Sequence, residues 1–171
     1  MLKKNLQSFS LIEMMIFIVI LSIFFIMAAS VVTFTLRNMK FNESKIKATH
    51  YSNQLEEWLR TQKEIDWGGE LCNGCVNPSN FTQSATGQGN SGDNYQTTYC
   101  FNSTPISGWQ DLGQCADYTL NSIFKREVVF TSQFISGYVN QINVSITISW
   151  KDLGDDRSIS TNTVFTVLEQ P

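Results

Sequence analysis

Charge is scarce in this sequence, and its absence excludes several classes of function. Charged residues make up 16% of the 171 residues, and the net charge is −3 at pH 7. The sequence has no basic patch or stripe of the kind that a nucleic-acid-binding surface requires, so we expect no nucleic acid as a partner. Histidine occurs once, at His50, and a single histidine forms a catalytic triad only if serine and aspartate converge on it. We therefore expect no enzyme.

Charge is missing altogether between Met14 and Leu36, and proline is missing between Phe9 and Lys63. At a rise of about 1.5 Å per residue, a helix over the uncharged run covers the roughly 30 Å hydrocarbon core of a bilayer. Two lysines precede the run, so the positive-inside rule places the N-terminus in the cytoplasm. The sequence predicts a membrane-spanning helix followed by an extracytoplasmic domain.

A cleavable secretory signal is the first alternative for this run. Its apolar core is shorter, about 7–15 residues, and it ends at a site of small residues. Ala28-Ala29-Ser30 is the only candidate for such a site.

A second alternative is a plain signal anchor in which Glu13 occurs by chance. A carboxylate costs about 2.5–3.5 kcal/mol at a helix centre in the membrane, so Glu13 needs a partner or a position near the interface.

The stretch Ser8-Phe9-Ser10-Leu11-Ile12-Glu13 resembles the prepilin cleavage and methylation motif of type IV pilins and pseudopilins. The resemblance covers about residues 3–35. It implies that a prepilin peptidase cuts between Ser8 and Phe9 and methylates the new amino group of Phe9. It also implies that Glu13 pairs with the N-terminal amine of a neighbouring subunit during assembly. Serine replaces the usual glycine before the cut, and the helix-kinking proline of many major pilins is absent.

The resemblance implies a structural subunit, a minor pilin or pseudopilin of a type IV pilus or a related type II secretion filament. Such a subunit is held in the bacterial inner membrane by a single pass. Its implied partners are the prepilin peptidase, other pilin or pseudopilin subunits, the inner-membrane assembly machinery and the membrane itself; no cofactor is implied. A membrane-anchored binding module, adhesin-like or a DNA-uptake tip pilin, is the alternative. A membrane-anchored enzyme or thiol oxidoreductase would need a catalytic constellation that the sequence lacks.

The helix is expected to continue beyond the membrane, because no proline or glycine occurs between Arg37 and Lys63. Small and apolar residues recur there at steps of three and four, which is the pattern of a helix with one buried face. They are Ser44, Ala48, Tyr51, Leu55, Trp58 and Leu59. We predict one helix from Phe9 to about Lys63, ended by Gly68 and Gly69.

The C-terminal third has the clearest strand pattern. From Gln141 to Trp150 apolar and polar residues alternate strictly, and the segments 126–135 and 157–168 flank this strand across short turns. The expected fold is α+β, with an antiparallel sheet covering the outer half of the long helix, as in pilins. The expected divisions are a leader (1–8), a transmembrane half-helix (9–36), an extracytoplasmic half-helix (37–66) and a head (67–171). Between 67 and 113 we expect loops, with one or two short strands near Tyr95–Phe101.

Four cysteines, Cys72, Cys75, Cys100 and Cys115, lie on the extracytoplasmic side and predict disulfides. Three pairings are possible. Cys72–Cys75 with Cys100–Cys115 is favoured because Asn73-Gly74 is a ready tight turn, although a bridge between the early and late cysteines would attach the head better to the helix. A Cys₄ zinc site is a weaker alternative, because zinc ribbons normally end in a second close cysteine pair. We expect no metal.

Overall fold

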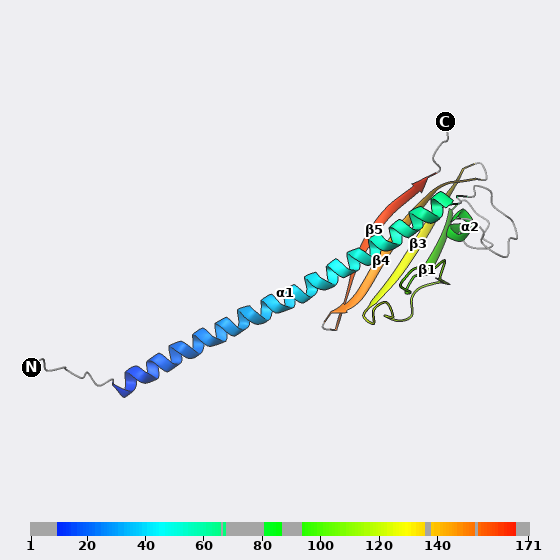
Figure 1. Cartoon of the computed structure of the whole chain (residues 1–171). Coiled ribbons are helices and arrows are strands. Elements are labelled where there is room, and N and C mark those ends of the chain that lie inside the picture. Colours follow the sequence, from blue (N-terminus) through cyan, green and yellow to red (C-terminus); the bar gives the residue numbers. More distant parts are fainter. Residues whose placement is uncertain are drawn as a thin grey trace, which may run out of the picture. The chain divides into compact units, whose positions relative to one another are not determined.

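The computed structural model describes residues 10–65, 67, 81–86, 94–135, 138–152 and 154–166 (Figure 1). The chain divides into two compact units, Met1–Glu43 and Ser44–Pro171. The division falls inside helix α1 (Leu11–Ile65), which matches the predicted helix over nearly all its length. The predicted boundaries at 8/9, 36/37 and 66/67 stay predictions.

The first unit contains the apolar part of α1. Every leucine, isoleucine, valine, methionine and phenylalanine from Leu11 to Leu36 is exposed, on all sides of the helix. The hydroxyls of Ser22, Thr33 and Thr35 each donate a hydrogen bond to the carbonyl four residues earlier, at 2.7–2.9 Å. These polar side chains are thus satisfied within the helix, which suits them to apolar surroundings. By length and composition, α1 is able to cross a membrane.

The second unit contains a five-stranded antiparallel sheet in the order β2-β1-β3-β4-β5. Figure 1 labels β1, β3, β4 and β5. The strands are β1 (Asn94–Cys100), β2 (Asp111–Leu112), β3 (Phe124–Ile135), β4 (Tyr138–Asp152) and β5 (Asp155–Thr166). The predicted three-stranded meander is confirmed as β3, β4 and β5. The strand expected near Tyr95 is β1, which pairs with β3 although about two dozen residues separate them in the chain.

The core of this unit lies between α1 and one face of the sheet. The buried face of α1 carries Ser44, Ala48, Ser52, Leu55 and Leu59. Opposite them, the inner faces of β3 and β4 bury alternate apolar residues: Val128, Phe130, Ile142, Val144, Ile146, Ile148 and Trp150. Tyr51 and Trp58, expected in the buried stripe, lie half-buried at its margins, and Ser52 takes the central position. The α+β arrangement, with α1 packed on an antiparallel sheet, is pilin-like.

The prediction of loops with one or two short strands between 67 and 113 missed one element. A short helix, α2 (Phe81–Thr86), lies there. The Phe81 ring is almost fully buried and packs against Trp67, Phe130 and Phe165, with ring centroids 5.5–6.5 Å apart. Six residues carry too little periodicity to predict a helix, and α2 is held by these distant aromatic contacts.

Candidate functional site

Glu13 lies in the first turn of α1 and is exposed. It has no ion-pair partner among the described residues, which begin at Ser10. The positive end of the helix dipole lies at this terminus, so an acidic side chain is favourable here. Ser8 and Phe9, the residues on either side of the predicted cut, lie outside the described residues. Cleavage and methylation at that bond therefore stay predictions.

Glu13 is the only charged residue from Leu11 to Leu36. The surface that follows it is apolar all round; Phe17 and Phe24, for example, are 59% and 65% exposed. A helix that is hydrophobic on every side is stable in a bilayer or among other apolar helices, and not in water. This part of α1 can therefore serve as a membrane anchor and as a surface for helix packing.

The head contains a disulfide between Cys100 and Cys115, one of the two bridges in the favoured pairing. Their Cα atoms are 4.9 Å apart, at the end of β1 and in the loop that leads to β3. Both sulfurs are used in this bond, so neither is available as a zinc ligand in this structure. Cys72 and Cys75 lie outside the described residues, and their pairing stays a prediction. No cluster of three metal-ligating side chains occurs in the part of the chain that the structure describes.

Arg126 is a buried residue that the sequence reasoning did not single out. Its guanidinium donates hydrogen bonds to the carbonyls of Phe101, Ser103 and Tyr51 and to the Gln54 side chain. Burial lowers the pKa of Arg126 to about 10. The alternation of inner-face residues in β3 places position 126 beside Phe124 and Val128, so period-two reasoning could have found it.

The Asn102 side chain also connects the loop after β1 to β3, close to Arg126. Its amide nitrogen donates to the Asp117 carbonyl and to Thr119 Oγ1, and its amide oxygen accepts from the Arg126 backbone N–H. Its side chain is thus fully engaged in holding the loop after β1 against β3.

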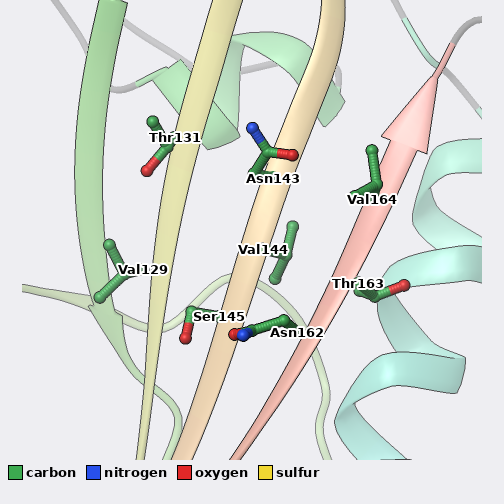
Figure 2. A pocket seen from close by; sticks show the side chains of 8 residues that line it. All are labelled: Val129, Thr131, Asn143, Val144, Ser145, Asn162, Thr163 and Val164. Carbon is green, nitrogen blue, oxygen red and sulfur yellow. The ribbon is translucent and has the colours of Figure 1, made fainter.

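The outer face of the sheet has a shallow hollow of about 280 Å³ across β3, β4 and β5 (Figure 2). It is lined by Val129, Thr131, Asn143, Val144, Ser145, Asn162, Thr163 and Val164. None of these side chains titrates or carries charge, so they supply neither an acid or base for catalysis nor a positive charge for an anion. His50 lies apart from it, exposed on α1 beside Tyr51.

Comparison with known proteins gives one match. A family model described as the prokaryotic N-terminal methylation motif matches residues 3–29. No curated protein and no solved structure matches the chain. The motif, together with the long apolar helix α1, supports a type IV pilin-like protein. It implies processing by a prepilin peptidase and assembly with other pilins, and it points to a structural protein that is anchored in a membrane through α1.

Proposed function

We propose that this chain is a minor pilin or pseudopilin, a structural subunit of a type IV pilus or a related type II secretion filament. The observation that carries the proposal is the juxtaposition of two features in the sequence and the structure. The methylation motif at residues 3–29 overlaps the first part of α1, where the apolar side chains up to Leu36 are exposed on every side and Glu13 is the only charge.

This arrangement supports two successive environments for the same helix. In the inner membrane, the apolar surface faces lipid and the extracytoplasmic head follows it. In the filament, the same surface packs against the first helices of neighbouring subunits. The Glu13 carboxylate then pairs with the methylated amine of a neighbouring Phe9, because an ammonium group supplies the counter-charge that a carboxylate in apolar surroundings requires.

The absence of proline along α1 supports a minor component. Proline in a helix interior removes a backbone hydrogen bond and kinks the helix. Many major pilins have such a proline late in the apolar run, whereas α1 of this chain has none from Leu11 to Ile65. No backbone hydrogen bond of α1 is therefore lost to a proline, and no proline kinks the helix.

The test is to express the full chain in membranes with and without a prepilin peptidase and to determine the intact mass and N-terminal sequence of the extracted product. We expect a product that begins at methylated Phe9 only when the peptidase is present. An uncut N-terminus under both conditions would leave a signal-anchored membrane protein and overturn the proposal.

Assembly is tested separately with Glu13→Ala, co-expressed with the filament system of the host. We expect this variant to be cut as the wild type is, but to be lost from sheared or purified filaments. Glu57→Ala is the matched control, because Glu57 is an exposed acidic residue of the same helix outside the apolar run. Equal incorporation of Glu13→Ala and wild type would contradict the assembly role.

A further inference from the structure

Strand β5 is an outermost strand of the sheet and pairs on one side only, with β4. No described residue pairs with its other edge. The opposite edge of the sheet ends in β2, which has two residues, whereas β5 has twelve. A long unpaired edge offers a row of backbone donors and acceptors to any extended segment that reaches it.

The register shows which backbone groups face this edge. Asp152 pairs with Asp155 across a two-residue loop, and a β-turn hydrogen bond joins the residues that flank such a loop. Bonded and non-bonded pairs alternate along an antiparallel ladder, so residues 155, 157, 159, 161, 163 and 165 bond to β4. The residues that direct their N–H and C=O groups outward are Ser158, Ser160, Asn162, Val164 and Thr166.

The edge lacks the features that usually protect such strands. Lysine, proline or a β-bulge normally blocks an exposed edge. Ser158–Thr166 contains no charged residue and no proline, and its pairing with β4 has no register shift. The nearest charges are Arg157 and its partner Asp155, 3.3 Å apart at the start of the strand. A strand added along Ser158–Thr166 therefore faces no charged residue over nine positions.

The edge is also held in place. The Ser52 hydroxyl of α1 donates a 2.9 Å hydrogen bond to Thr161 Oγ1, which fixes the middle of β5 on the inner face. On the outer face, Asn162 and Val164 form one side of the neutral hollow (Figure 2), and Val164 is 54% exposed. A pre-ordered strand loses little conformational entropy on binding.

We infer that β5 is a strand-addition site that binds an extended, uncharged segment of another polypeptide. The main-chain groups of the outward residues supply the hydrogen bonds, and the neutral flanks select against charged segments. The inference does not depend on the proposed function, because it concerns the sheet of the head and not the N-terminal motif.

The probe is a fluorescent synthetic peptide with the sequence of residues 158–166, preceded at its N-terminus by a two-lysine tail for solubility. In antiparallel pairing centred on Asn162, it opposes Ile159 to Phe165 and Thr161 to Thr163 and brings no charge against a charge. The full chain in detergent micelles is titrated with it, and amide hydrogen exchange is then measured. We expect saturable binding and slowed exchange at residues 158, 160, 162, 164 and 166, with little change at the odd-numbered residues.

Asn162→Pro removes one outward N–H without touching the bonds to β4, and proline is tolerated at such edge positions. We expect it to weaken peptide binding about tenfold, because a hydrogen bond contributes about 0.5–1.5 kcal/mol. Asn162→Ala keeps the N–H and should bind as the wild type does. A peptide of scrambled sequence that carries three glutamates should not bind.

Three outcomes would overturn the inference. One is the absence of binding by a wild-type chain whose Cys100–Cys115 disulfide is intact. Another is binding that leaves the even-numbered amides unprotected. The third is protection of those amides by the chain itself before the peptide is added, because the edge would then already be occupied.

Discussion

Arg126 in β3 donates a 3.0 Å hydrogen bond from Nη1 to the backbone carbonyl of Tyr51 in α1, 75 positions earlier. The same guanidinium bonds the carbonyls of Phe101 and Ser103, next to the disulfide at Cys100. One buried side chain thus joins the helix, the sheet and the disulfide loop. All of these acceptors are neutral, so hydrogen bonds and not an ion pair offset the cost of burying the charge.

Arg126→Lys is expected to destabilise the head by about 3 kcal/mol, because an ammonium group cannot reach the separated acceptors that the guanidinium joins. The free energy of unfolding is measured by urea titration of the full chain in detergent, followed by tryptophan fluorescence. Arg157→Lys is the control; Arg157 is exposed, and its change should stay within about 0.5 kcal/mol. Equal losses in the two variants would contradict the role of Arg126.

Tyr118 is expected to titrate above pH 10. Its hydroxyl donates a 2.8 Å hydrogen bond to Asp156, and this bond is the main cause that raises the pKa of Tyr118. A raised pKa in the folded state means that the contribution to stability is complete below pH 10 and is lost as pH rises through the folded pKa. In Asp156→Asn the alkaline midpoint, measured by tyrosinate absorbance, should fall. In Asp155→Asn it should not move; no shift in either variant would contradict the assignment.

Loss of the disulfide in Cys100→Ser/Cys115→Ser should lower the free energy of unfolding by about 3 kcal/mol, because the closed loop of 15 residues restricts the unfolded chain. The measurement is urea unfolding of the oxidised variant beside the oxidised wild type. Cys72→Ser/Cys75→Ser should cost less, since the predicted bridge closes a very short loop. Peptide mapping by mass spectrometry checks the pairing; a fragment that links Cys72 to Cys75 is expected, and a mixed disulfide with Cys100 would refute it.

Leu55→Ala should destabilise the head by about 3 kcal/mol, because Leu55 is fully buried under the sheet and its truncation leaves a cavity. Ile46→Ala on the same helix should change stability by less than about 0.5 kcal/mol, since Ile46 is 70% exposed. Thermal unfolding of both variants gives the comparison. A large loss for Ile46→Ala would mean that its exposed face is covered in the detergent-solubilised chain.

Ser8→Gly should increase the fraction of chain cut by the prepilin peptidase in a short pulse, because the motif that residues 8–13 resemble usually has glycine before the cut. The ratio of cut to uncut chain is read by gel mobility and confirmed by mass. Ser10→Gly, on the other side of the cut, is the control. An unchanged ratio would show that serine is as good a substrate residue as glycine for this peptidase.

Much of the fold follows from local patterns. Sequence reasoning predicted α1 because Leu11–Ile65 contains no helix-breaking residue, and β4 because Gln141–Trp150 alternates without interruption. The strands β3 and β5 followed from their short turns to β4. Helix α2 was missed, since it is held by residues distant in the chain: Phe81 packs on aromatic rings of other elements, and the Tyr99 hydroxyl donates a 2.8 Å hydrogen bond to the Ser84 carbonyl.

Some features of the candidate site could likewise be predicted from the sequence, and others could not. The motif around Phe9 and the carboxylate of Glu13 are visible in consecutive residues, because a peptidase and a membrane both act on a continuous segment of chain. The open edge of β5 was not visible, because a strand is central or outermost only relative to the other strands. The Cys100–Cys115 pairing was favoured among three possibilities but was not determined until β1 and the following loop were placed.

The sequence by itself determined the processing motif, the apolar helix and the alternation of the C-terminal strands, since each depends on residues within about one or two turns or a few strand positions of one another. The tertiary structure alone decided that β1 lies beside β3, that Arg126 is buried among carbonyls and that β5 ends the sheet. These features depend on contacts between residues far apart in the chain, and the free energy that selects them is the burial of one face of the sheet beneath α1.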